Sequence, residues 1–308
     1  MTDYQSIYDI SSKGFIPDKC LLNCPIDFRY LDDFLFLYQK KSFNEFDDFR
    51  NFIKDYPYMN DKPKITFENF KLDEIKKLYS VTSILCHLYV WSGEYNDKNI
   101  PKCLAIPWFE SSQQLDIPPV LTHAAVDLYN WRIINSDLPF SLDNIKPIYT
   151  FNLEKNVKKS EEWFYLPMIA IEGECGCILH KMEEIYEVIE SDTITDNPNI
   201  FLENLEFIRN KLERQYEILI QTRNCKPEHF YHKVRPFLGG STDGNGWYLE
   251  GVDTYVLYEG GSAAQSSLIQ AEDIFFGIEH PNDKFLEKMR SYMPGLHRNY
   301  LENQSRHK

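Results

Sequence analysis

The sequence predicts a mainly α-helical fold. Two segments, residues 72–91 and 197–222, carry apolar side chains every three or four positions, which is the spacing of one face of an α-helix. Few strands are expected, because only the glycine-rich stretch 241–261 has the character of a loop or short hairpin. With 308 residues, the chain is long enough for one large domain or two smaller ones around a buried core.

The N-terminal part is expected to alternate helices with loops that glycine and proline interrupt. Residues 1–30 are predicted to be irregular, and helical spacing follows over residues 31–56. After the helix over 72–91, residues 96–107 are predicted to form a loop. A further helix is predicted over 118–131, since proline is tolerated in a first helical turn.

A domain boundary is predicted within residues 136–160, where Pro139, Pro147 and a charged run interrupt the helical pattern. The run KKSEE within it has the composition of a solvated helix start. The prediction is therefore a small N-terminal domain over residues 1–140 and a larger helical domain over 141–308.

The C-terminal part is predicted to be almost entirely helical. A helical block over 161–191 contains Pro167, where a kink or break is expected. The segment 197–222 has the clearest apolar stripe, and the helix over 227–240 ends at a glycine pair suited to a left-handed cap. Two more helices are predicted, over residues 262–278 and 283–293.

Composition limits the classes of partner. The net charge of −14 leaves no basic stripe for nucleic acid or an anionic membrane. There is no apolar signal-peptide segment at the N-terminus and no apolar run near the roughly 20 residues of a membrane helix. The seven cysteines, an odd number, predict reduced thiols and a cytoplasmic protein. An aromatic content of 15% fits a thick core or an aromatic-lined pocket.

Two motifs suggest ligand binding. In GGSAAQSS (260–267), glycines followed by a serine are typical of a helix N-terminus that binds an anion, and equally of an ordinary serine cap. Phe230 and Arg235 suit a ligand with a planar carboxylate and a stacked ring. On a regular α-helix they would lie about 140° apart around the axis, so a surface arginine is the alternative.

Two clusters have some of the ligand types that metals prefer. Residues 175–180 hold two cysteines and a histidine, but they lack the Cys-x-x-Cys spacing and second ligand pair of structural zinc. Residues 228–232 hold a glutamate and two histidines, but the glutamate would point away from the histidine pair on a helix. Neither cluster is predicted to bind a metal.

Six segments carry a resemblance to a known family. They are YVWSGEYNDKNIPKCLAIPW (89–108), LDIPPVLTHAAVDLYNW (115–131), EEWFYLPMIAIEGE (161–174), RPFLGG (235–240), GGSAAQSS (260–267) and MRSYMPGLHRNY (289–300). In this order and spacing they resemble the indoleamine 2,3-dioxygenase family of heme enzymes. The resemblance covers residues from about 75 to 301, and residues 1–70 contribute little to it.

The resemblance implies a fold and a reaction. The fold has a small N-terminal domain above the heme and a larger all-helical domain that holds it. The reaction uses heme b to insert both atoms of O2 across the indole C2–C3 bond of L-tryptophan, which gives N-formylkynurenine, the first product of the kynurenine pathway. Such chemistry requires five-coordinate ferrous heme and a dry apolar side for O2. The implied partners are an aromatic amino acid and O2.

The resemblance also implies roles for individual residues. Arg235 would pair with the substrate carboxylate, and Phe230 would pack on the indole. Ser262 and Ala263 would lie beside the heme edge and the backbone of the substrate amino acid. Trp163 would take a position in the aromatic pocket, with Phe164 next to it on the same helix.

Two positions depart from the family pattern. Pro167 takes a position on the helix after the aromatic residue where the family often has serine or alanine, and the resemblance implies that it would lie beside the heme. His123 stands where tyrosine is common, and a histidine there would hydrogen-bond bound O2 or the indole N–H. The alternative for His123 is an ordinary core or surface histidine.

The largest departure from the family pattern concerns the ligand of the heme iron. In the family, the proximal histidine lies a few tens of residues after the HRN motif, whereas only eight residues follow Tyr300 here. We therefore expect that helix to be absent, Asp273 to lose its arginine partner, and apolar surface to be left for repacking, a partner or a homo-oligomer to cover. His297, within HRN, is the nearest substitute ligand, although the family uses it structurally.

Three functions remain open at this point. The first is a heme-dependent dioxygenase. The second is a non-catalytic or heme-free member that binds an indole or another aromatic carboxylate. The third is a different heme reaction on the same fold, similar to that of the second enzyme of pyrrolnitrin biosynthesis. The presence of an axial ligand to the heme iron would distinguish the first function from the second. The identity of the reaction product would distinguish the first from the third.

Overall fold

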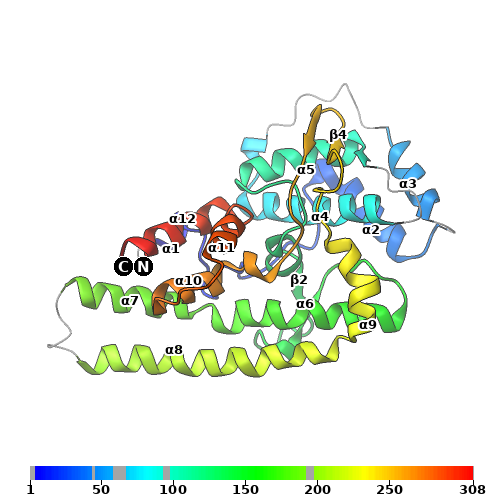
Figure 1. The fold of residues 1–308 in the computed structure, drawn as a ribbon. Coiled ribbons are helices and arrows are strands. Elements are labelled where there is room, and N and C mark those ends of the chain that lie inside the picture. The colour runs from blue at the N-terminus through cyan, green and yellow to red at the C-terminus, as the bar shows by residue number, and fades with distance from the viewer. Residues whose placement is uncertain (1–3, 44–45, 58–66, 93–97, 192–197, 308) are drawn as a thin grey trace.

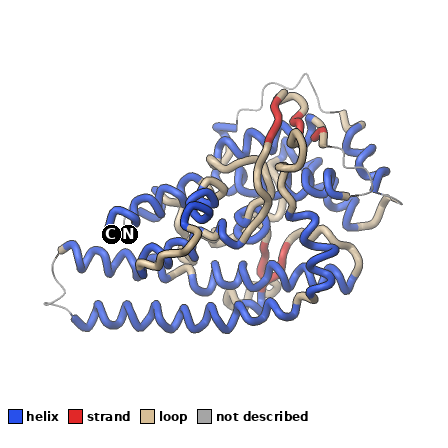
Figure 2. Tube along the Cα trace, in the orientation of Figure 1, coloured by secondary structure: helices blue, strands red, loops and turns tan. Residues whose placement is uncertain are grey.

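A computed structural model describes residues 4–43, 46–57, 67–92, 98–191 and 198–307. Helices dominate this part of the chain, which confirms the predicted mainly α fold (Figures 1 and 2). The helices are α1 (Tyr4–Ile7), α2 (Arg29–Gln39), α3 (Phe46–Lys54), α4 (Leu72–Trp91), α5 (Lys102–Gln114), α6 (Lys155–Cys175), α7 (Ile178–Glu190), α8 (Pro198–Leu219), α9 (Pro227–His229), α10 (Ser267–Phe276), α11 (Asp283–Arg290) and α12 (Gly295–Gln304). None of them is long and apolar enough to cross a membrane.

Five short strands accompany the helices. They are β1 (Asn99–Ile100), β2 (Trp131–Ile133), β3 (Ile145–Pro147), β4 (Trp247–Leu249) and β5 (Thr254–Val256). β4 and β5 form the hairpin predicted within residues 241–261, and β1 adds to β4 in parallel. β2 and β3 form a separate antiparallel pair.

The helices pack in two groups (Figure 1). α6 and α7 follow one another, and the long helix α8 packs against both of them. α4 packs with α2 and α5 in the second group, while α10 contacts both α7 and α12. The two ends of the chain lie close together, where the rings of Tyr8 and Tyr300 are 5.6 Å apart. The main buried core joins residues from both sides of position 140, and the division at that position remains a prediction.

Helix α4 is the central element of its group. Its bounds are those that the sequence predicts, but every residue from Ile75 to Val90 is buried. The few polar groups inside it find partners, since Ser80 donates to the Ala125 carbonyl at 2.7 Å and Thr82 to the Leu78 carbonyl at 2.7 Å. A helix buried on all sides gives a rigid support for the loops around it.

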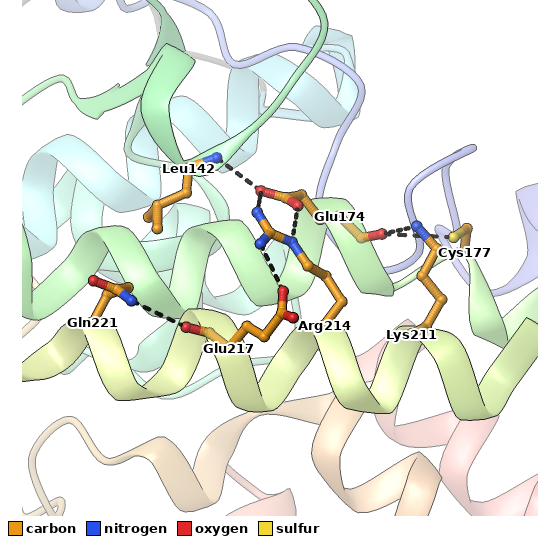
Figure 3. Close-up of polar contacts among 7 residues, drawn as sticks. All are labelled: Leu142, Glu174, Cys177, Lys211, Arg214, Glu217 and Gln221. Atoms are coloured by element: carbon orange, nitrogen blue, oxygen red, sulfur yellow. Dashed lines mark hydrogen bonds and ion pairs between the residues drawn. The ribbon is translucent and has the colours of Figure 1, made fainter.

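An ion-pair network joins α6 to α8 (Figure 3). Arg214 of α8 donates to the Glu174 carboxylate at 2.8 Å and to that of Glu217 at 3.1 Å. In the last turn of α6, the Glu174 carbonyl accepts from the Lys211 ammonium at 2.7 Å and from the Cys177 thiol at 3.8 Å. The same Glu174 carboxylate accepts the Leu142 N–H at 2.8 Å and so ties the loop before β3 to this pair.

The break in the block 161–191 is not at Pro167. That proline lies inside α6, and the helix ends at Cys175, with Gly176 as its C-cap. At this point the chain passes so close to the N-terminal segment that a Cβ on Gly176 would overlap the Lys13 carbonyl oxygen. The close contact with residues 13 and 14 thus requires glycine at the point where the helix stops.

The helix predicted over 118–131 is wrong. The chain is a loop as far as a π turn over Ala124–Leu128, and β2 begins at Trp131. Tertiary hydrogen bonds replace helical ones, because the Tyr79 hydroxyl donates to the Val120 carbonyl at 2.8 Å and His87 accepts the Leu121 N–H at 2.8 Å. Because tertiary partners satisfy these backbone groups, the segment does not require helical hydrogen bonds.

The loop predicted over 96–107 is wrong in its second half. Helix α5 begins at Lys102 and contains Pro107. Pro107 has no N–H to give to the Cys103 carbonyl, and the Tyr30 hydroxyl donates to that carbonyl instead, at 2.8 Å. A side chain distant in the sequence thus makes the proline tolerable within the helix.

Candidate functional site

The two glycine motifs, RPFLGG (235–240) and GGSAAQSS (260–267), lie side by side. The Gly261 N–H donates to the Leu238 carbonyl at 3.1 Å, and the Ser241 N–H donates to the Tyr258 carbonyl at 2.8 Å. A Cβ on Gly260 would overlap the Leu238 carbonyl oxygen, so this close approach requires glycine. RPFLGG and GGSAAQSS are therefore parts of one structural unit.

Helix α4 anchors the first motif through a neutral histidine. His87 accepts the Leu121 N–H on Nε2 at 2.8 Å, so its Nδ1 carries the hydrogen and donates to the Phe237 carbonyl at 2.8 Å. Burial lowers the pKa of His87 to about 3, which keeps the ring uncharged. One turn on, the Trp91 indole donates to the Gly239 carbonyl at 3.2 Å.

A π turn brings Phe230 and Arg235 to the same side of their helix. The Arg235 N–H donates to the Phe230 carbonyl, which closes a five-residue turn and places the two residues about one turn apart. The separation of about 140° expected for a regular α-helix therefore does not apply. The Phe230 ring packs on Phe164 of α6 with centroids 4.7 Å apart, and the exposed Arg235 lies over Tyr231 at 5.5 Å.

The serines of the second motif act as helix caps. The half-buried Ser262 accepts the Ala264 N–H at 3.3 Å, and Ala263 beside it is exposed. Ser266 accepts the Ile269 N–H at 3.3 Å at the start of α10. The helix therefore begins at residue 267, five positions after the predicted start, because the chain first makes a short 3-10 turn.

Trp163 and Pro167 lie four residues apart on one face of α6, the first half-buried and the second buried. Pro167 cannot donate a hydrogen bond to the Trp163 carbonyl. The ring in contact with Phe230 is that of the next residue, Phe164. The sequence signal for Phe164 is only its position directly after Trp163.

His123 is buried between two carboxylates. Its Nδ1 lies 2.8 Å from Asp127 and its Nε2 lies 2.9 Å from Glu172, with the ring 2% exposed. Burial alone would lower the pKa of His123, but the charges and hydrogen bonds of Asp127 and Glu172 raise it to about 10. Both ring nitrogens are already bonded, so a contact of His123 with O2 or indole, which remains a prediction, would require one of these pairs to open.

The His123 cluster extends to the second glycine motif. The Ser266 hydroxyl donates to Glu172 at 2.7 Å, and the backbone N–H of His123 donates to the Gln265 side chain at 3.0 Å. The amide of Gln265 in turn donates to the Gly260 carbonyl at 2.9 Å. The pair His123–Asp127 is visible in the sequence as an i, i+4 spacing, whereas Glu172, Gln265 and Ser266 have no sequence signal that links them to it.

The buried histidines of the described structure are the first candidates for an axial ligand to heme iron. Of the three buried histidines, His87 and His123 use both ring nitrogens. His297 packs on Phe15 with centroids 4.5 Å apart and lies 3.5 Å from Asp9, in the N-terminal segment. Across the described ranges, no group of three or more His, Cys, Asp or Glu side chains is arranged to hold a metal ion. Among these buried histidines, His297 alone has ring nitrogens without a hydrogen-bond partner, so the described residues leave the iron ligand unassigned.

Comparison with known proteins gives one consistent family. The family described as indoleamine 2,3-dioxygenase matches residues 5–308. The indoleamine 2,3-dioxygenase of Aspergillus candidus is 31% identical over 275 residues, which are 81% of this chain and 65% of that protein. The Saccharomyces cerevisiae indoleamine 2,3-dioxygenase is 30% identical, over 74% of this chain and 54% of its own length.

A mammalian relative shows a similar level of identity. Indoleamine 2,3-dioxygenase 2 of Mus musculus is 34% identical over 70% of this chain and 54% of its own length. The chain thus spans between 54% and 65% of the length of these three relatives. With a family match over nearly its whole length, the chain belongs to the indoleamine 2,3-dioxygenase family.

Proposed function

We propose that the protein acts in the heme-dependent opening of the indole ring of L-tryptophan to N-formylkynurenine, the entry reaction of the kynurenine pathway. Family membership supports this proposal. The observation that carries it is the π turn that places Arg235 one turn from Phe230. When bound, a heme would supply the activation of O2, and the residues of this chain would bind and orient the amino acid.

The chemistry of these side chains suits an aromatic amino acid. The exposed Arg235 guanidinium presents a planar fork of donors that matches a carboxylate. The Phe164–Phe230 pair offers an aromatic face for an indole ring. We propose that Trp163 and Ser262, both half-buried, border the same site.

We propose a cofactor edge next to this substrate surface. Pro167 and Ala263 are the residues that we assign to it, together with Ser262, and heme b is the group proposed there. A second candidate function is a heme-free protein that binds an indole or aromatic carboxylate through Arg235 and Phe230. It is favoured by the protein contacts that already occupy both ring nitrogens of His87 and His123. A different heme reaction on the same fold would differ from the first proposal in its product.

A hemin titration followed by absorption separates the two candidates. The dioxygenase proposal requires a Soret band that saturates at one hemin per chain, a ferrous-CO spectrum typical of histidine ligation, and conversion of tryptophan. Weak, non-saturating uptake of hemin by a protein that still binds tryptophan would reject it in favour of the heme-free binder. A His297→Gln variant tests the substitute ligand, since it should abolish saturation only if His297 ligates iron.

We also propose a cytoplasmic location. All seven cysteines are free thiols, six of them buried, which fits a reducing compartment. Fractionation of cells that produce the full chain tests this directly, and recovery outside the cytoplasm would contradict it.

A further inference from the structure

We infer that His123 is a positioning residue, whose ring, buried between Asp127 and Glu172, holds the loop of Ser262 against the segment that leads from Arg235. The inference rests on the proposed function only in treating the residues around Ser262 and Arg235 as the tryptophan site. The geometry behind it depends only on this chain and would hold with or without a heme.

The first step is the charge of the cluster. Both ring nitrogens of His123 face a carboxylate, so each carries a hydrogen and the ring is an imidazolium. Asp127 comes from the same π turn and Glu172 from α6. Two further titratable groups of the described structure interact with these carboxylates, Glu272 of α10 with Glu172 and Tyr165 of α6 with Asp127, and neither supplies a positive charge.

The second step is the consequence of losing that charge. One oxygen of Asp127 and one of Glu172 are buried without a hydrogen-bond partner in the described structure. Neither carboxylate pairs with a described lysine or arginine. Without the imidazolium of His123, the two buried carboxylates would lack a counter-charge, and the elements that carry them would no longer be joined through the ring.

The third step is the path from this cluster to the ligand surface. The backbone N–H of His123 donates to the Gln265 side chain, whose amide donates to the Gly260 carbonyl at 2.9 Å. The next residue, Gly261, donates to the Leu238 carbonyl at 3.1 Å. These bonds connect the buried cluster directly to both glycine motifs.

The fourth step is the second attachment of the same loop. Ser266 both caps α10 and donates to Glu172 at 2.7 Å. The loop from Gly260 to Ser266 is thus held at both ends by groups bonded to the His123 cluster. Ser262 lies between these two attachments, and the attachment through Glu172 depends on the charge at residue 123.

Amide hydrogen exchange of the full chain, without hemin or tryptophan, tests the inference. In His123→Gln, peptides that cover residues 258–266 should exchange at least about tenfold faster than in the wild type, while peptides of α8 stay unchanged. His180→Gln is the matched control, because that ring bonds the Ser11 carbonyl at 3.0 Å, away from the loop. Unchanged exchange over residues 258–266 in a folded His123→Gln protein would overturn the inference.

A second variant covers the case in which His123→Gln does not fold. Glu172→Gln keeps the acceptor for Ser266 and His123 and removes only the charge. Ring NMR signals, with His123 identified by comparison with Glu172→Gln, should report an imidazolium at pH 8.5 in the wild type. Because one carboxylate charge is lost, the titration midpoint should fall by about one pH unit or more in the variant. A wild-type ring that titrates near the ordinary value of about 6.5 would reject the positioning role.

The two proposals fail in different ways. A loop that loosens in His123→Gln supports the inference even if the wild type never binds tryptophan, which would reject only the proposed function. If the wild type binds tryptophan and amide exchange over residues 258–266 is unchanged in His123→Gln, only the inference is rejected.

Discussion

At the residue scale, Arg235 and Phe230 show what residue type can and cannot predict. An arginine near a phenylalanine predicts a site for an aromatic carboxylate, but their orientation depends on a π turn that no sequence pattern announces. His123 is similar, because its type marks it as a candidate while Glu172, its partner on α6, is remote in the sequence. Partners brought together by tertiary packing are invisible to local patterns.

Glu272, a buried carboxyl on α10, gives a pH prediction at this scale. Burial raises its pKa to about 8, although the hydrogen bond from Gln215 opposes the shift. Because this folded-state pKa lies above the ordinary value of 4.5, the native state keeps a proton that the unfolded chain releases. Stability should therefore fall as pH rises from about 4.5 to 8.

Glu272→Gln should remove that dependence. The carboxamide oxygen still accepts from Gln215, so we expect the free energy of unfolding at pH 8 to exceed that of the wild type by roughly 1–3 kcal/mol. Near pH 4.5 the two proteins should be alike. Urea unfolding at several pH values measures the difference, and parallel pH profiles for the two proteins would contradict the assignment.

At the element scale, the paired glycine motifs make a sharp prediction. Gly260→Ala should destabilise the fold by about 1–3 kcal/mol and weaken tryptophan binding, because the new methyl group meets the Leu238 carbonyl. Gly261→Ala is the matched control, since its Cβ would lie 3.4 Å from the Leu121 carbonyl oxygen, an ordinary contact. Thermal unfolding of both variants tests the pairing, and equal melting temperatures would refute it.

The elements also show where local pattern suffices. α4 and α8 follow the sequence prediction closely because a long apolar repeat has few alternatives. The segment 118–131 does not, because Tyr79 and His87 bond its backbone from α4. Proline is a poor guide to helix ends for the same reason. Pro107 lies within α5, where the Tyr30 hydroxyl donates to the Cys103 carbonyl that the proline leaves without a helical donor.

At the scale of the whole molecule, an apolar surface on α8 predicts self-association. Leu202 is 59% exposed, Tyr216 68% and Leu219 48%. We expect the purified chain to bind a hydrophobic dye and to exceed its monomer mass of 36.5 kDa in light scattering. A compact monomer that binds no dye would exclude this.

Charge variants locate that surface. Leu202→Glu should reduce both the dye signal and the mass, because it places a charge within the apolar surface of α8. Ile26→Glu is the control, since Ile26 is 79% exposed on a different element. Equal effects of the two substitutions would show that association does not depend on α8.

The central claim is that Arg235 and Phe230 recognise an aromatic amino acid, and calorimetry with L-tryptophan and indole tests it most directly. Both ligands are titrated into the wild type, Arg235→Ala and the exposed-arginine control Arg223→Ala, with and without one equivalent of hemin. Only tryptophan has the carboxylate, so Arg235→Ala should weaken its binding by about tenfold to a hundredfold and leave indole binding nearly unchanged. Equal losses for both ligands, or no loss for tryptophan, would contradict the account.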